Sequence, residues 1–387
     1  MTMLIEKKSR QIKGFVQTAL WGASAGRCQF AGCNKPLSYH HVTKEEVNVA
    51  QKAHIYAFSE SGPRGNNGIE VENLNSIENL LLACHGCHKL IDDSSYLERY
   101  TVEELHRMKK AHERRIELVT GIDINKQSHV LLFGANIGIQ NPVLEFKAAA
   151  SAMFPEYFPA DRSAIELGFG VNDFEDHERE FWFFEKSALE KSFDKRVKPL
   201  LQSGEIKHLS IFGLAPQPLL IKLGSLLVDI AEVEVYQRLR EPATWKWQND
   251  NEVENFDVIE PAISSDIIAI NLSISATIDN ARIHSVLGEK VAIYTVTVPT
   301  PHNDIIRSKT QLKHFRQTLR KLLDSIKLNN PNATCLNVFP AMPVSCAIEF
   351  GRINMPKADL PLSIFDEQRG QGGFVHTFNI NPQMNKA

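Results

Sequence analysis

Two cysteine pairs constrain this chain more than any other feature of its sequence. Four residues separate Cys28 from Cys33, and two separate Cys84 from Cys87. Four thiolates at such spacings are typical of a structural zinc site. The sequence therefore predicts a tetrahedral zinc centre made by these four cysteines. The alternative is four unrelated buried thiols.

Two histidines and an asparagine lie among and beside the cysteines, at His54, Asn79 and His88. Residues 47–58 are β-compatible and run into a turn rich in Gly, Pro and Asn, so we expect His54 near a strand end. Asn79 begins a second short apolar strand. Residues 84–92 are expected to form a helix with His88 and Asp92 one turn apart on one face. The pattern predicts strand, loop, strand, helix.

The order His, Asn, His, with the Asn leading into Cys-x-x-Cys-His, resembles the HNH endonuclease family and its ββα-metal site. The resemblance implies a metal-dependent endodeoxyribonuclease, a phosphodiester hydrolase. His54 fits the general base, because a histidine is largely neutral near pH 7, and the amide of Asn79 would hold the loop that aims it. Hydrolysis also needs a divalent cation. We expect His88 and Asp92 to bind Mg²⁺ or a similar hard ion, distinct from the zinc.

One position departs from the family pattern. Many HNH sites place a metal ligand directly before the base, and here that position is Ala53, which coordinates nothing. Asp92 is therefore the first choice for a further ligand, with Asp93 and water behind it. The doublet His40–His41 is a weaker candidate than His54, because no Asn and ligand follow it at a better spacing. A purely structural zinc ribbon is the alternative to a nuclease.

A basic helix follows the metal module. Thr101-Val-Glu-Glu104 resembles a capping box and predicts a helix to about Val119. Residues 1–120 hold 16 Lys and Arg against 14 Asp and Glu, whereas the remainder holds 27 against 32. Cations are suited to phosphate contacts. The basic side comprises Arg107, Lys109, Lys110, Arg114 and Arg115, of which Arg107, Lys110 and Arg114 are the candidates for DNA binding.

Residues 120–123 break this helix, and alternating strands and helices follow. We therefore expect a nuclease domain at 1–122 and a second domain at 123–387. Strand–helix–strand units near 208–236 and 291–339 predict an α/β fold with two parallel-sheet halves. Ligands of such sheets bind beyond the carboxyl ends of the strands. The candidate ligand contacts there are Gln217, Thr300, His302 and Pro340.

A short aromatic segment, Trp245-Lys246-Trp247, lies between the two halves. Tryptophan and lysine together can stack on a base and contact a phosphate. Two tryptophans at i and i+2 are as often the packing residues of a strand. Both alternatives stay open from the sequence.

The region 125–387 resembles the SAVED domain, a fusion of two CARF-like, Rossmann-type halves that binds cyclic oligonucleotides. The residues that carry the resemblance are 212–216, 245–247, 294–299 and 339–343, leading towards Gly351-Arg352. With the HNH module in front, the chain resembles the HNH–SAVED effector nucleases of bacterial cyclic-oligonucleotide anti-phage signalling (CBASS). This implies a homo-oligomer, dimeric or of higher order on ligand binding, that degrades double-stranded DNA once a cyclic di- or trinucleotide is bound.

The remaining features concern location and rival functions. Six cysteines, four of them at zinc spacing, fit a reducing cytoplasm. The charged N-terminus and short apolar runs indicate neither a signal peptide nor a membrane span, so we expect a cytoplasmic protein without membrane contact. One rival is a restriction-type HNH nuclease whose second domain reads modified DNA, which its negative charge disfavours. The other is a non-catalytic nucleotide sensor with a zinc scaffold.

Overall fold

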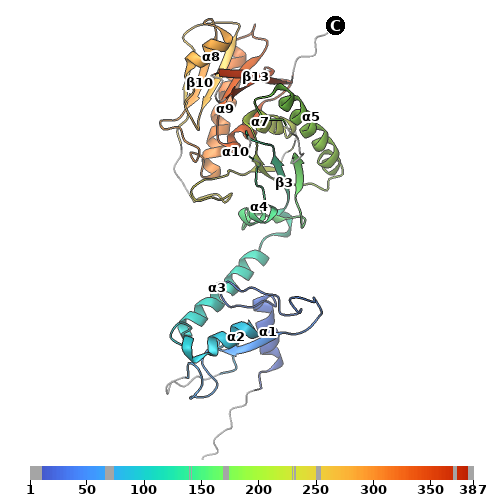
Figure 1. The fold of residues 1–387 in the computed structure, drawn as a ribbon, viewed down its shortest axis with the longest axis vertical. Helices are drawn as coiled ribbons and strands as arrows, with labels where there is room; N and C mark the ends of the chain where they lie inside the picture. Colours follow the sequence, from blue (N-terminus) through green and yellow to red (C-terminus); the bar gives the residue numbers. More distant parts are fainter. Residues whose placement is uncertain are drawn as a thin grey trace, which may run out of the picture. The chain divides into compact units, whose positions relative to one another are not determined.

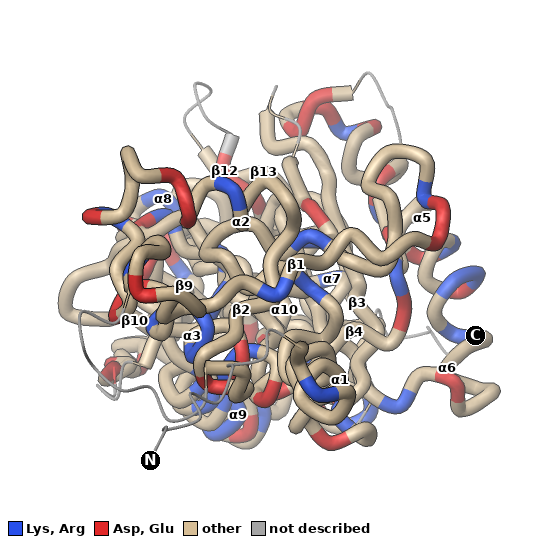
Figure 2. The backbone as a smooth tube through the Cα atoms, turned by 90° about the horizontal axis from the view of Figure 1, so that it is seen from below, with Lys and Arg blue, Asp and Glu red and all other residues tan. Residues whose placement is uncertain are grey.

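The computed structural model describes residues 11–65, 74–138, 140, 142–168, 174–228, 230, 232–249, 254–368 and 373–381. The chain divides into two compact units, Met1–Asp123 and Ile124–Ala387 (Figure 1). Within the described ranges, no helix has the length and apolar composition needed to cross a membrane. Charged residues of both signs lie along α3 (Val102–Thr120) and α5 (Arg179–Arg196), whereas those of α9 (Lys309–Asn329) are mostly basic, as Figure 2 shows.

The N-terminal unit is built on a two-stranded antiparallel sheet. β1 (Ala50–His54) pairs with β2 (Leu80–Cys84), so that His54 lies opposite Leu80. α2 (His85–Asp92) follows β2 directly. Thr101 caps α3 by accepting a hydrogen bond from the backbone of Glu104, as the capping box predicts. The core contains Leu20, Leu37, Ile55, Leu81, Ile91 and Leu105, which are fully buried.

The first helix of the described residues belongs to the N-terminal unit. α1 spans Gly14–Ser24. Phe15, which lies in its first turn, is 83% exposed, whereas Leu20 is buried. The helix thus joins the core through its second half.

The first half of the C-terminal unit holds a parallel sheet in the order β4-β3-β6-β7, with β5 also pairing with β3. A parallel sheet is covered by helices on its faces, and its inner strand β6 is accordingly buried at five of its six positions. The strands are β3 (Gln127–Gly134), β4 (Phe158–Pro159), β5 (Ile165–Gly168), β6 (Leu209–Leu214) and β7 (Val233–Val235). The helices are α4 (Phe146–Met153), α5, α6 (Lys198–Gln202) and α7 (Gln217–Leu226).

The second half holds a six-stranded sheet in the order β13-β12-β11-β9-β10-β8. Its four inner strands are parallel, and its two edge strands, β8 and β13, are antiparallel. The strands are β8 (Asp257–Ile259), β9 (Ile268–Ser273), β10 (Ala292–Thr297), β11 (Leu336–Ala341), β12 (Leu362–Gln368) and β13 (Gly373–Ile380). The helices are α8 (Asn280–Leu287), α9 and α10 (Val344–Ile353).

The two halves meet where α7 packs against α10. A Cβ added at Gly224 would lie 2.0 Å from the carbonyl oxygen of Ile348, and one at Gly351 would lie 2.0 Å from that of Ile221. Each glycine therefore meets the backbone of the other helix, and the contact is reciprocal. Such an approach excludes any side chain at either position. The halves are thus joined by a close, nearly symmetric helix crossing.

Candidate active site and zinc centre

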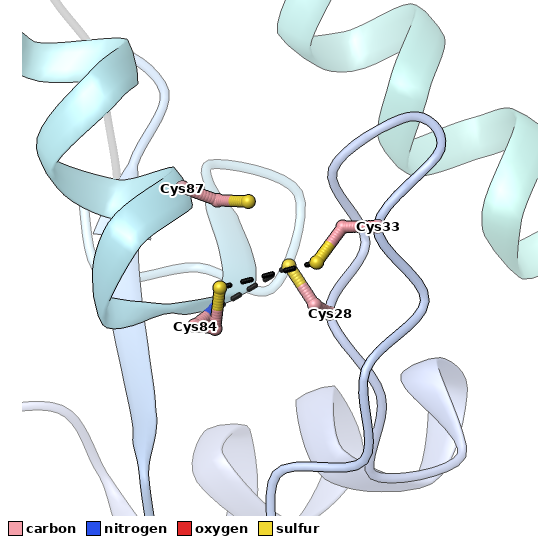
Figure 3. A group of neighbouring side chains, drawn as sticks. All are labelled: Cys28, Cys33, Cys84 and Cys87. Atoms are coloured by element: carbon pink, nitrogen blue, oxygen red, sulfur yellow. Dashed lines mark hydrogen bonds between the residues drawn. The ribbon is translucent and has the colours of Figure 1, made fainter. Parts of the chain in front are cut away.

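Four thiols converge where the loop after α1 meets the start of α2 (Figure 3). The Sγ atoms of Cys28, Cys33, Cys84 and Cys87 all lie within 4.8 Å of one another. Those of Cys33 and Cys84 are 3.9 Å apart. Tetrahedral zinc with Zn–S bonds of about 2.3 Å separates its sulfurs by about 3.8 Å. The cluster could therefore hold zinc. In the described parts of the chain, no other group of three or more His, Cys, Asp or Glu side chains could hold a metal ion.

The loop that carries the first cysteine pair is fastened to β2 by Gln29. The backbone N–H of Gln29 donates to the carbonyl oxygen of Leu82 at 2.8 Å, and the side-chain oxygen of Gln29 accepts from the N–H of Leu82 at 2.7 Å. Gln29 is 1% exposed. This pairing brings Cys28 close to Cys84, whose N–H donates to the Cys28 sulfur at 3.3 Å. These contacts hold the first cysteine pair beside the second.

The protonation of the thiols follows from their burial. Burial raises the pKa of Cys28 to about 12 and raises the pKa of Cys87 beyond its usual range. At Cys84 burial also opposes ionisation, but hydrogen bonds, first from Cys87, outweigh it and lower the pKa. Zinc binds thiolates, so metal binding must release protons from this cluster.

His54 is the last residue of β1 and is half-buried. Its Nε2 lies 3.0 Å from Oδ1 of Asn75, and its ring packs edge-on against Phe58 at 5.8 Å. The preceding Ala53 is 1% exposed and belongs to the core. Successive side chains of a strand point to opposite faces. The position that carries a metal ligand in many HNH sites therefore faces the core here, which gives a physical reason for an alanine.

Asn79 holds the chain that follows His54. Its Oδ1 accepts from the N–H of Tyr56 at 2.8 Å, and its Nδ2 donates to the carbonyl oxygens of Tyr56 at 3.1 Å and Leu74 at 2.9 Å. Asn79 is 4% exposed. A buried amide with all these bonds fixes the backbone around it.

His88 and Asp92 lie one turn apart on α2, with His88 Nε2 3.4 Å from one Asp92 oxygen. The other oxygen accepts from Arg64 Nη2 at 2.6 Å. Arg64 also donates from Nε to the carbonyl oxygen of Ile55 at 3.0 Å, and its side chain is 4% exposed. The guanidinium therefore joins the end of β1 to α2, the two elements that carry the predicted site residues.

Neither Arg64 nor Asn75 is singled out by the sequence, although both contact the predicted site. Arg64 belongs to the Gly- and Pro-rich turn after His54. A cationic residue inside that turn is the one sequence feature that could have pointed to it. Asn75 lies just beyond the undescribed residues 66–73, in a segment without periodicity. Their roles depend on contacts across 28 and 21 residues of sequence, respectively, which local patterns do not reveal.

The basic side of α3 is smaller than expected. Lys109 is 5% exposed and forms an ion pair with Glu113, so the expectation that it belongs to a solvent-facing basic side is wrong. Arg107 is exposed but bound to Glu104 through two hydrogen bonds. Lys110 and Arg114 are exposed and lie beside a shallow pocket that Glu113 also lines. These two remain the better-placed cations for phosphate.

Comparison with protein families agrees with this geometry. Residues 28–95 match the HNH endonuclease model, and residues 189–380 match SAVED, the SMODS-associated and fused to various effectors sensor domain. The chain joins an HNH endonuclease domain to a SAVED domain. No curated protein matches it.

Solved structures similar to the chain are Cap4 SAVED/CARF-domain containing receptors. The Acinetobacter baumannii receptor with the cyclic trinucleotide 2'3'3'-cAAA is 15% identical, with a TM-score of 0.43 over 76% of this chain and 61% of that chain. The receptor from Moraxella osloensis is 13% identical, with a TM-score of 0.38 over 74% of this chain and 60% of that chain. The chain thus spans less than two thirds of the length of these receptors.

In the SAVED domain, the residues of the segment Trp245-Lys246-Trp247 differ in how deeply they are buried. Trp245 is 5% exposed, and its ring packs edge-on against Phe212 at 5.3 Å. Trp247 is half-buried and stacks on Tyr236 at 6.2 Å. The packing alternative therefore describes Trp245, whose buried faces leave no room for a base. Lys246 is exposed.

The other residues expected to contact ligand, at the carboxyl ends of the strands, differ in their exposure and in their contacts. Pro340 is buried within β11, opposite Leu272, and β11 runs one residue beyond it, so its contact with ligand stays a prediction that this burial does not support. Gln217 begins α7 and accepts from the N–H of Met342 at 2.9 Å, which ties the two halves together. Thr300 and His302 are exposed in the loop after β10.

Proposed function

We propose that the chain is a cyclic-oligonucleotide-activated, metal-dependent endonuclease that degrades double-stranded DNA in anti-phage defence. The observation that supports this best is the combination, on one chain, of an HNH site braced by a four-thiol cluster with a SAVED sensor domain. The HNH domain supplies phosphodiester hydrolysis, and the SAVED domain supplies the response to a cyclic oligonucleotide.

His54 is the general base of this proposal. Asn75 Oδ1 faces Nε2 of His54, so the neutral imidazole carries its proton on Nε2 and has a lone pair on Nδ1. Nδ1 takes a proton from the attacking water, whose oxygen bonds to phosphorus as the bond from phosphorus to the leaving oxygen breaks. Asn79 and Arg64 position this base by fixing the backbone of Tyr56 and Ile55, which directly follow it. A positioned base typically contributes about 10² to 10⁴ in rate.

His88 and Asp92 are the residues that would hold the catalytic cation. A hard ion such as Mg²⁺ is commonly bound by one or two protein groups, with waters and substrate phosphate completing its shell. The pair offers one nitrogen and one carboxylate on a single helix face. When bound, the ion would neutralise charge that develops on the phosphate and the leaving oxygen. Arg64 keeps the Asp92 carboxylate turned towards this face.

The SAVED ligand would be a cyclic di- or trinucleotide bound beyond the carboxyl ends of the strands. Lys246, Thr300 and His302 are its candidate contacts, because all three are exposed and the last two closely follow the carboxyl end of β10. One HNH site cuts one strand. Cleavage of both strands is therefore served by two sites, and assembly of protomers on ligand binding would supply them together.

Plasmid degradation by the purified chain tests the proposal. The chain is incubated with Mg²⁺, supercoiled plasmid and each member of a panel of cyclic di- and trinucleotides, and its mass and thermal unfolding are followed in parallel. One nucleotide should raise the unfolding temperature by mass action, increase the particle mass and switch on degradation. Full activity without nucleotide, or ligand binding without any cleavage, would refute gated nuclease activity.

A further inference from the structure

A groove of about 1080 Å³ lies in the SAVED domain between α9 and the segment that follows α10. Six cationic side chains line it: Lys313, Arg316, Arg320, Lys321, Arg352 and Lys357. Its apolar lining includes Val228, Ile353 and Met355, the last of which is 41% exposed. Blue segments of Lys and Arg follow α9 in Figure 2. Cations thus concentrate here although the unit as a whole has more acidic than basic residues.

Acidic side chains fix the arginines of this groove but do not neutralise it. The buried carboxylate of Glu349 binds both Arg316 and Arg352, at 3.0 and 2.8 Å, so one negative charge serves two guanidiniums. Arg320 is held by Asp359 and Asp324, at 2.6 and 2.7 Å. Arg316 nevertheless keeps a side chain that is 43% exposed.

The three lysines of the groove make no ion pair with any residue of the described ranges. Lys313, Lys321 and Lys357 are all exposed. Six cations therefore face three carboxylates, and the excess of positive charge is carried by these lysines. A cleft lined by charges of one sign raises the local concentration of ions of the opposite sign.

The groove lies away from the expected cyclic-oligonucleotide site. α7 and α10 begin just after the carboxyl ends of β6 and β11, where that ligand is expected. Val228 lies just after the end of α7. Ile353 is the last residue of α10, and residues 355–358 follow it. The groove is thus formed by the opposite ends of the same helices.

We propose that this groove binds the phosphate backbone of duplex DNA. The proposal rests on the proposed function only for the identity of the nucleic acid. Lys313 and Lys321 are eight residues apart, about 12 Å along the helix at 1.5 Å per residue. A duplex strand presents about three to four phosphates over that length, at 3.4 Å each. Lysines bind phosphates as point charges, the exposed arginine can donate in a fork, and deoxyribose can cover the apolar lining.

A salt series on the full chain tests this proposal. Binding of a fluorescein-labelled DNA duplex is measured by anisotropy without added divalent cation, over increasing sodium chloride. The groove variant carries Lys313→Gln, Lys321→Gln and Lys357→Gln. The matched control carries Lys195→Gln, Lys207→Gln and Lys290→Gln, which remove three exposed lysines of the same unit away from the groove. Circular dichroism checks that both variants fold.

The groove variant should bind at least ~10-fold more weakly near physiological salt, and its slope of log affinity against log salt should fall by about 2.7, since each phosphate contact contributes about 0.9. The control should keep the parental slope. Equal slopes in the groove variant and the parent, or no duplex binding by the parent, would overturn the proposal. So would displacement of the duplex by equimolar tripolyphosphate, because that would indicate a small phosphate ligand. Plasmid cleavage with Mg²⁺ is scored separately, so the proposed nuclease can stand if the groove proposal fails.

Discussion

The guanidinium of Arg64 binds the carboxylate of Asp92 at 2.6 Å and thereby joins the loop after β1 to the end of α2. The same side chain donates to the carbonyl oxygens of Ile55 and Ile91, and its Nη2 lies 3.4 Å from that of His54. Arg64 adopts a left-handed backbone with a φ of 56°, which costs an L-residue roughly 1–2 kcal/mol. The bonds of the guanidinium offset that cost. One residue therefore sets the relation between the base and the helix with the proposed cation ligands.

Replacing Arg64 by methionine should weaken both folding and cleavage. The variant leaves buried carbonyl groups without a donor, and each such loss costs about 1–3 kcal/mol, so unfolding of the N-terminal unit should be easier by about 3 kcal/mol. Urea unfolding and plasmid cleavage measure the two effects. Arg99→Met is the control, because the side chain of Arg99 is exposed and its guanidinium lies over the ring of Tyr100. Parental stability in Arg64→Met would contradict this bracing role.

The purified chain should contain one zinc per molecule, held by the four cysteines. Cys33→Ser with Cys84→Ser should lose the metal, and the N-terminal unit should unfold, since a structural zinc contributes about 10–16 kcal/mol of binding free energy. Metal analysis and circular dichroism provide the readouts. Cys335→Ser is the matched control, because that thiol lies outside the cluster. Zinc retained at the parental level by the double variant would exclude this site.

His54→Ala should reduce ligand-activated plasmid cleavage by about 10²- to 10⁴-fold, the usual contribution of a general base. The fold should persist, because the half-buried ring contacts Asn75 and Phe58 and lies outside the apolar core. Cleavage rates and zinc content are measured together. His41→Ala, at an exposed turn, serves as the control. Unchanged cleavage in His54→Ala would mean that another residue acts as the general base.

The sequence predicts those parts of the site that are specified by residues close to one another in the chain. The strand, strand and helix order appears as β1, β2 and α2, because each element depends on residues a few positions apart. Each cysteine pair is also local, and zinc chemistry predicts that the two pairs converge although 51 residues separate Cys33 from Cys84. Arg64 was missed because its partners lie far along the chain. Trp245 was ambiguous because only the fold decides whether an aromatic ring covers Phe212 or faces solvent.

The central strand of the second sheet was also missed. β9 is buried at all six positions, but Asn271 interrupts its apolar run and makes it resemble a loop. The structure explains this asparagine, whose Nδ2 donates to the carbonyl oxygen of Ile278 and to Oδ1 of Asn280. A polar residue is tolerated in a buried strand when its side chain is fully bonded. That bonding cannot be inferred from the run itself.

Gly224→Ala should destabilise the SAVED domain by about 3 kcal/mol, because the new methyl group overpacks the interface between α7 and α10. Its Cβ would lie 2.0 Å from the carbonyl oxygen of Ile348, which must move with its helix. Thermal unfolding measures the loss. Gly373→Ala is the control, since nothing lies within 4 Å of a Cβ built there. Equal unfolding temperatures for the two variants would mean that the helix crossing is looser than described.

The buried His208 should make the SAVED domain sensitive to acid. Its Nδ1 lies 2.7 Å from Ser128 Oγ, and its ring stacks on Tyr157 at 4.0 Å. Burial, with Lys126 and Lys309 nearby, lowers the pKa of His208 to about 4.

In the unfolded chain this imidazole titrates near pH 6.5. Between about pH 6.5 and 4 the unfolded state therefore binds the proton more readily, so stability is complete above this window and falls by about 3 kcal/mol as pH drops through it. Urea unfolding at pH 7 and pH 5 should show about 2 kcal/mol of this loss in the parent. His208→Asn removes the titrating group, keeps a polar atom near Ser128 and should flatten the dependence. The same loss of stability in both proteins would assign the acid sensitivity to other groups.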